Sequence, residues 1–156
     1  MNTESSNGDQ YQRLKFSGLE ENDLLVLREG RERVLDEMPS VLDRFYEHVG
    51  NFPETRAFFR NSDHIAHAKS MQIRHWEIIL NGTFDEDYVK SVTAIGEVHN
   101  KLGLEPRWYI GGYSFLICGL CEAITKRHER KSMFAGKMAG SAAALRGVII
   151  KAALLD

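Results

Sequence analysis

The chain has 156 residues, a formal net charge of −2, and 43% hydrophobic and 10% aromatic residues. A chain of this length fits one domain with a substantial core. The balanced charge, without a long basic run, argues against nucleic-acid binding, and no apolar stretch reaches the length of a membrane span. The polar start of the chain lacks the apolar core of a signal peptide. We therefore predict a disordered lead-in over residues 1–16 and one cytoplasmic domain over residues 17–156.

Apolar residues recur with helical spacing along the rest of the chain, and almost no segment alternates with period two. Capping-box patterns occur at Ser17 with Glu20 and at Thr83 with Glu86, and Asn61 is a further N-cap signal. The other helix starts are signalled by Pro53, Pro106 and Ser132. In chain order we predict helices over residues 17–36, 38–50, 53–59, 62–82, 83–103, 106–130 and 132–156. The predicted fold class is all-α, with seven helices on short connections.

The two cysteines, Cys118 and Cys121, form a CxxC pattern within one predicted helix. A redox motif of this kind belongs near a βαβ unit, which the chain lacks, and covalent haem attachment would need a histidine where Glu122 stands. We interpret the pair as thiols packed in a helix.

The helix predicted over residues 83–103 places a histidine on its apolar face. His99 continues a stripe of apolar residues spaced 4, 3, 4 and 3 apart, which consists of Tyr88, Val92, Ile95, His99 and Leu102. A buried imidazole is costly unless something satisfies it. Spacing alone favours a core histidine bonded to a carbonyl or hydroxyl group, and a cofactor metal is the alternative.

Two other predicted helices carry polar groups among apolar neighbours. Tyr46 follows Phe45 beside Leu42 and Val49, and taken alone it is best interpreted as a tyrosine at the edge of the core. The long helix has His75 on one face with Ala68, Met71 and Ile79. The pair His64 and His67 lacks further ligands for zinc, so a capping or solvated role is favoured.

Three segments resemble the globin-coupled sensor family. Residues 95–113, IGEVHNKLGLEPRWYIGGY, resemble its proximal region, which reads roughly I-x-x-[IV]-H-x-x-[IL]-G-[IL]-x-P-x-W-Y-[MI]-G. Arg44-Phe45-Tyr46 resembles its distal F-Y step, and residues 80–88, LNGTFDEDY, look like its corner between two helices. The resemblance runs from about residue 18 to the end of the chain.

The resemblance implies a globin fold that holds haem b, binds O2 reversibly at ferrous iron, also takes CO and NO, and signals to a C-terminal output module. It implies that His99 is the proximal iron ligand, that the Tyr46 hydroxyl contacts bound O2, and that Tyr109 lies near His99. At the distal positions of the long helix this chain has Ala68 and Met71, neither of which is a side-chain hydrogen-bond donor. The remaining residues expected around the cofactor are Phe45, Phe59, Met71, His75, Ile79, Ile95, Val98, Leu102 and Tyr113.

The last predicted helix has two different faces. One bears the stripe Met138, Ala142, Leu145, Ile149 and Ala152. The other bears small residues, namely Gly136, Gly140, Ala143 and Gly147. We predict that the bulky face packs in the core of its own subunit and that the small face forms a homodimer through the last two helices, whose geometry carries the signal. Close packing within one subunit is the alternative.

Two other function classes compete with the haem sensor. One is a related globin without haem that acts as a protein-interaction module, although retention of both His99 and Tyr46 argues against it. The other is a haem enzyme such as a dioxygenase or peroxidase, but no paired acid–base set or reductase segment is evident. We expect this domain itself not to be an enzyme, while an attached output module could be one.

Overall fold

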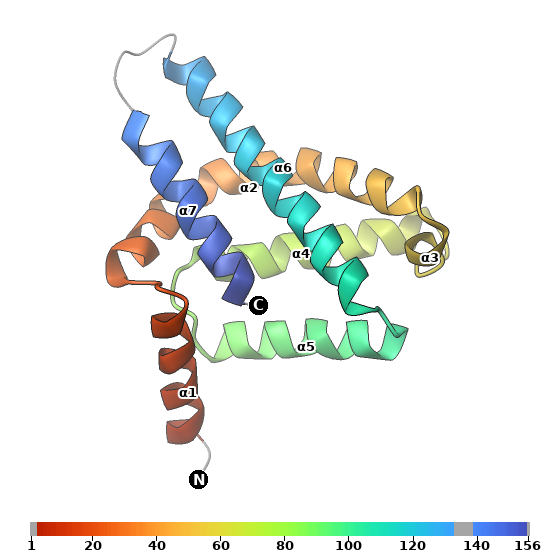
Figure 1. Ribbon diagram of the computed structural model, residues 1–156, viewed down its shortest axis with the longest axis horizontal. Helices are drawn as coiled ribbons and strands as arrows, with labels where there is room; N and C mark the ends of the chain where they lie inside the picture. Colours follow the sequence, from red (N-terminus) through yellow and green to blue (C-terminus); the bar gives the residue numbers. More distant parts are fainter. Residues whose placement is uncertain (1–2, 133–138, 156) are drawn as a thin grey trace.

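The computed structural model describes residues 3–132 and 139–155, and its side chains over 10–130 and 142–155. Over these residues it contains seven α-helices and no strand (Figure 1). The helices are α1 (Thr3–Phe16), α2 (Glu21–Gly50), α3 (Pro53–Arg56), α4 (Ser62–Leu80), α5 (Glu86–Leu102), α6 (Pro106–Ser132) and α7 (Ala139–Leu155). The all-α prediction is confirmed, but several of the predicted helix boundaries differ from those observed.

The first difference is at the N-terminus, where α1 occupies residues predicted to be a disordered lead-in. The side chain of Gln10 is buried, and Leu14 packs against the hydrophobic core. Arg13 donates from Nη2 to the main-chain oxygen of Leu155 at 2.8 Å, which joins α1 to the end of α7. The polar composition gave no sign of this helix because its partners lie at the other end of the chain.

The second difference is in α2, which runs unbroken through Pro39 where two helices were predicted. Pro39 is exposed, while Met38, Val41 and Leu42 around it are buried. A proline inside a helix removes one backbone hydrogen bond and strains the preceding turn. Burial of the apolar residues on both sides of Pro39 offsets that cost.

The N-terminus of α2 is capped three residues later than predicted. Glu20 and Asp23 form the capping box, and the Glu20 amide donates to Asp23 Oδ2 at 3.2 Å. Ser17 instead ends α1, where its amide donates to the Arg13 carbonyl at 3.0 Å. Lys151 on α7 also binds Asp23, with Nζ 2.8 Å from Oδ2.

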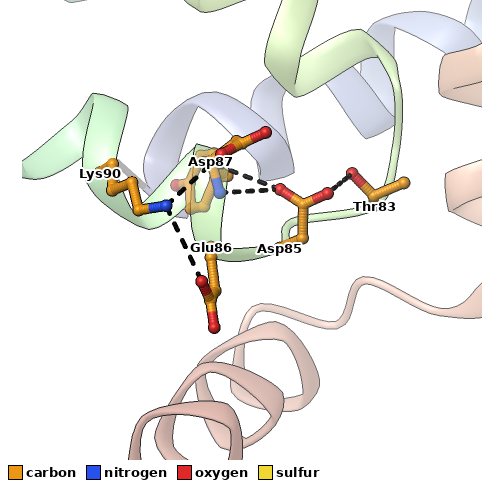
Figure 2. Close-up of polar contacts among 6 residues, drawn as sticks. Thr83, Asp85, Glu86, Asp87 and Lys90 are labelled. Atoms are coloured by element: carbon orange, nitrogen blue, oxygen red, sulfur yellow. Dashed lines mark hydrogen bonds and ion pairs between the residues drawn. The ribbon is translucent and has the colours of Figure 1, made fainter. Parts of the chain in front are cut away.

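The start of α5 was predicted correctly within three residues, but its cap is Asp85 rather than a Thr83–Glu86 box (Figure 2). Asp85 Oδ1 accepts from the amides of Asp87 and Tyr88 at 3.0 and 3.3 Å. Thr83 donates from its hydroxyl to Asp85 Oδ2 at 2.9 Å. This hydrogen bond, together with the amide donors, holds the pKa of Asp85 below its usual range, so the cap remains a charged acceptor.

The connection between α4 and α5 is closely packed. Gly82 has φ +63°, and a Cβ at this position would lie 2.9 Å from the Leu24 carbonyl oxygen of α2. Phe84 also has positive φ, at 47°, which is strained for a bulky residue. Its buried ring packs edge-on against Tyr88, 4.8 Å between centroids, and this burial compensates for the strain.

The remaining boundaries agree with the sequence in most cases. Asn61 caps α4 and accepts from the His64 amide at 2.9 Å, and Pro106 begins α6. Gly103 ends α5 in the left-handed conformation. Ser132, however, is the last residue of α6 and not the cap of the following helix.

Helix α2 is central to the packing, because it contacts α3, α4, α6 and α7 (Figure 1). α6 and α7 also pack together, while α5 packs mainly against α4. The buried stripe of α7 was predicted correctly for Ala142, Leu145, Ile149 and Ala152, and Met138 lies outside the described residues. Among the described residues, no helix combines the length and apolarity that crossing a bilayer requires.

Both cysteines lie on α6 with free thiols. Cys118 is exposed, while Cys121 is partly buried and packs against the core. Burial, followed by the neighbouring Cys118, raises the pKa of Cys121, which keeps its thiol protonated and weakly reactive. The predicted packing therefore holds for Cys121 only.

Candidate functional site

Tyr46 lies on α2 with its side chain buried, 7% exposed. Two phenylalanine rings meet it edge-on, Phe45 at 5.0 Å and Phe59 at 5.4 Å between centroids. Lys69 of α4 places Nζ 5.8 Å from the centre of its ring. Burial raises the pKa of Tyr46 above its usual value, so the phenol keeps its proton and can act as a hydrogen-bond donor.

His75 lies on α4 where this helix packs against the N-terminal half of α5, and it is 5% exposed. Its Nδ1 lies 2.8 Å from the Ser91 hydroxyl of α5. Its ring also stacks on that of Tyr88, 6.1 Å between centroids, and Tyr88 is fully buried. His75 therefore joins α4 to α5 as a hydrogen-bonded core residue.

His99 lies in the last turn of the same helix α5 and is half-buried. Burial lowers the pKa of its imidazole, which favours the neutral form that can coordinate a metal. The ring of Tyr109 meets it edge-on at 5.3 Å between centroids, and Tyr113 stacks on Tyr109 at 5.6 Å.

The short connection between α5 and α6 sets this arrangement. Gly103 turns the chain in the left-handed conformation, and the Leu104 amide donates to the His99 carbonyl at 3.0 Å. Pro106 then begins α6, so that Tyr109 lies in its first turn beside His99. The order of glycine, proline and tyrosine after His99 is thus the local reason for the ring contact.

The apolar residues predicted around the cofactor divide into two groups. Phe45 and Ile79 are wholly or partly buried, as are Phe59, Ile95 and Tyr113. Three others are largely exposed, namely Met71 at 46%, Val98 at 54% and Leu102 at 42%. The C-terminal end of α5 thus carries exposed apolar side chains before and after His99 in the sequence.

Phe45 links the two aromatic groups of the site. A Cβ at Gly112 of α6 would lie 3.4 Å from the Phe45 ring, so α2 and α6 approach closely at this point. Gly112 precedes Tyr113, whose ring stacks on Tyr109. The rings around Tyr46 and the rings beside His99 are therefore joined through one helix contact.

Sequence reasoning did not single out Gln72, which lies between Met71 and His75 on α4. Its Oε1 is buried and has no hydrogen-bond partner among the described residues. A buried acceptor without a partner is uncommon. The regular spacing of Lys69, Gln72 and His75 was a signal that could have drawn attention to it.

The other histidine pair has a local role. His64 Nδ1 accepts from the Arg60 amide at 3.4 Å at the start of α4, and His67 is exposed. Within the described parts of the chain, no three histidine, cysteine or acidic side chains are grouped as metal ligands.

Comparison with known proteins identifies the family. The Protoglobin family profile matches residues 7–156. The chain is 26% identical over 113 residues to the heme-based aerotactic transducer HemAT of Halobacterium salinarum, a match that covers 72% of this chain and 23% of that protein.

The chain thus spans about a quarter of the length of this relative. The fold matches the globin domain of a Geobacter sulfurreducens globin-coupled sensor with a TM-score of 0.74 at 15% identity, over 92% of this chain and 89% of that one. These similarities confirm the globin fold and the resemblance to globin-coupled sensors. The chain belongs to the protoglobin family.

Proposed function

We propose that this domain is a haem b gas sensor that binds O2 reversibly and transmits the event to a C-terminal output module through a helical dimer. The observation that carries the proposal is the position of His99, a half-buried imidazole bordered in sequence by exposed apolar residues, whose pKa is lowered by burial. The haem-based name of the HemAT relative supports the same cofactor.

The residues around His99 fit a haem in their chemistry. A haem in a globin needs one axial imidazole and an apolar surround. His99 offers the imidazole, and the exposed side chains of Val98 and Leu102 offer apolar surface that a flat macrocycle would cover. His75 is the poorer candidate for the ligand, because it is only 5% exposed and its ring stacks on the fully buried ring of Tyr88.

When bound, haem iron supplies the coordination position for a diatomic gas. Tyr46 would provide the donor for that gas, since burial keeps its phenol protonated and the rings of Phe45 and Phe59 pack edge-on against it. A hydrogen bond among apolar neighbours favours O2, which gains partial negative charge, over CO, which gains less. CO and NO are expected as further ligands.

A route for the signal begins at the ring contact of His99 with Tyr109. A displacement of His99 would press on Tyr109 at the start of α6, which packs against α7 further along. We include in the proposal that α6 and α7 form the dimer, in keeping with the exposed face of α7. This face consists of Ala143, Gly147, Ile150 and Leu154.

The experiment that tests the sensor function is a set of visible spectra of the haem-reconstituted protein, reduced and exposed to O2 and CO, followed by stopped-flow O2 dissociation. We expect reversible O2-dependent bands. Replacement of Tyr46 by Phe should speed O2 dissociation about tenfold to a hundredfold, which corresponds to losing a strong hydrogen bond. CO dissociation should change far less.

Tyr11→Phe is the control, because it removes a phenolic hydroxyl from an exposed ring on α1 that is not part of the site. It should leave O2 dissociation within about twofold of the unaltered protein, well under the loss of one hydrogen bond. A protein that takes up no haem would contradict the proposal and favour the haem-free interaction module.

The dimer is tested by sedimentation of Ile150→Glu. A charge buried without a partner in an interface costs several kcal/mol, so the dissociation constant should rise by at least about tenfold. Leu25→Glu on α2 is the matched control, since Leu25 and Ile150 are exposed to similar extents, 46% and 42%. Equal effects of the two variants, or a monomeric unaltered protein, would contradict the dimer.

A further inference from the structure

The side chain of Gln72 contains a polar atom that the fold leaves unsatisfied. Its Oε1 is buried and accepts no hydrogen bond from any described residue. Removing an amide oxygen from water without a replacement donor is unfavourable. Such a group persists where it has a use, or where a donor is within reach of a side-chain rotation.

The register of α4 gives the direction of Gln72. Lys69, Gln72 and His75 follow one another at intervals of three residues, and each interval turns the side chain by about 60° around the helix axis. Lys69 reaches α2, where it pairs with Asp43 and lies over the Tyr46 ring.

His75 reaches α5, where it meets the Ser91 hydroxyl. Gln72 lies between these two directions, so it faces the space between α2 and α5.

Tyr46 contributes the complementary group from α2. It is buried, and the contacts described for it are with the rings of Phe45 and Phe59 and with the ammonium group of Lys69. Burial keeps its hydroxyl protonated and therefore a donor. Lys69, whose ammonium group lies over the Tyr46 ring, precedes Gln72 by about one turn of α4. The unsatisfied acceptor on α4 is therefore about one turn from a residue that already reaches the donor on α2.

We propose that Gln72 is a positioning residue for Tyr46: its Oε1 accepts the Tyr46 hydroxyl hydrogen when no gas is present. No hydrogen bond joins the two side chains in this structure, so the proposal requires a rotation of the Gln72 side chain towards Tyr46. This proposal rests on the proposed sensor function. Tyr46 must then exchange its bond to Gln72 for a bond to the gas, which O2 accepts well and CO accepts poorly. Gln72 thereby lowers O2 affinity and sets the threshold of the sensor.

The test replaces Gln72 by Met, which has similar length and no acceptor amide, in both the unaltered and the Tyr46→Phe backgrounds. With Tyr46 present, Gln72→Met should slow O2 dissociation about three- to tenfold, the effect of one ordinary hydrogen bond. With Tyr46→Phe the same replacement should have no effect, because the two residues act through one interaction. Gln10→Met is the matched control, since Gln10 also has a buried unpaired amide atom, on α1.

A second readout uses the haem-free protein. Ultraviolet resonance Raman difference spectra, unaltered minus Tyr46→Phe, report whether the Tyr46 hydroxyl donates a hydrogen bond. Gln72→Met should remove that signature and Gln10→Met should retain it. If Gln72→Met does not fold, Gln72→Glu decides, because a carboxylate accepts more strongly and should speed O2 dissociation.

Equal O2 dissociation in Gln72→Met and the unaltered protein overturns the inference and leaves the sensor function intact. Faster dissociation in both backgrounds also overturns it, since Gln72 would then act on the gas without Tyr46. An unaltered protein without haem overturns the sensor function and this inference together. Coupled effects confined to the Tyr46 background support the inference.

Discussion

A histidine lies at each end of helix α5, His75 of α4 against its N-terminal half and its own His99 in its last turn, and their surroundings differ in nearly every respect. At the N-terminal end, Tyr88 is fully buried and His75 of α4 meets the Ser91 hydroxyl at 2.8 Å. At the C-terminal end, His99 is half-buried and Leu102 is 42% exposed. The N-terminal end thus packs a histidine against a hydroxyl and a buried ring, while the C-terminal end leaves an imidazole partly exposed beside exposed apolar side chains.

The comparison shows what separates a structural histidine from a candidate ligand. Both histidines lie on apolar helix faces in the sequence, where spacing alone favours the structural interpretation for each. Their burial distinguishes them, since His75 is 5% exposed and stacks on the buried ring of Tyr88, while His99 is only half-buried. A partly exposed neutral imidazole can be reached by a metal, whereas an enclosed one cannot without rearrangement.

The largest expected effect comes from exchanging the two histidines for alanine in turn. His99→Ala should abolish retention of haem through gel filtration, because the imidazole proposed to hold the iron is lost. His75→Ala should retain haem and the O2-dependent bands, while the haem-free fold loses about 1–3 kcal/mol of unfolding free energy from the lost buried interactions. Loss of haem from His75→Ala with retention in His99→Ala would reverse the assignment.

A smaller effect, on stability alone, is expected from Ser91→Ala at the contact between α4 and the N-terminal half of α5. The change removes the hydroxyl beside His75 Nδ1 and should lower the unfolding free energy by about 1–2 kcal/mol in urea. Ser70→Ala, at an exposed position of α4, is the control and should have little effect. Equal stability of the two variants would show that the Ser91 hydroxyl contributes nothing to the unfolding free energy.

The smallest expected effect is a pH dependence of stability that comes from His99 at the C-terminal end of α5. Burial lowers the pKa of folded His99, so the unfolded chain takes up the proton first as pH falls through about 6.5. The contribution of His99 to the stability of the haem-free protein is therefore full above that pH, and it decreases as the pH falls towards the lowered folded value. His99→Gln should flatten this part of the urea-denaturation profile, whereas replacement of exposed His67 by Gln should not. An unchanged profile in His99→Gln would contradict the burial effect.

The sequence predicted the helical class and most helix boundaries because these depend on local chemistry. Asn61 and Pro106 mark helix starts through groups within a few residues, and Gly103 marks an end in the same way. The local signals failed where several candidates lay close together, as at Thr83 and Asp85. They failed too where distant packing outweighed a helix breaker, as at Pro39.

The sequence by itself determined that the chain is helical, where most helices begin and end, and that His99 and Tyr46 lie in motifs like those of a sensor globin. The tertiary structure alone decided that α1 is a helix held by the end of α7, that His75 lies beside the Ser91 hydroxyl, and that Gln72 Oε1 has no hydrogen-bond partner among the described residues. The physical reason is the distance along the chain over which each interaction acts. Caps and periodicity act over one or two turns, whereas the partner of a buried polar group comes from any helix that packs against it.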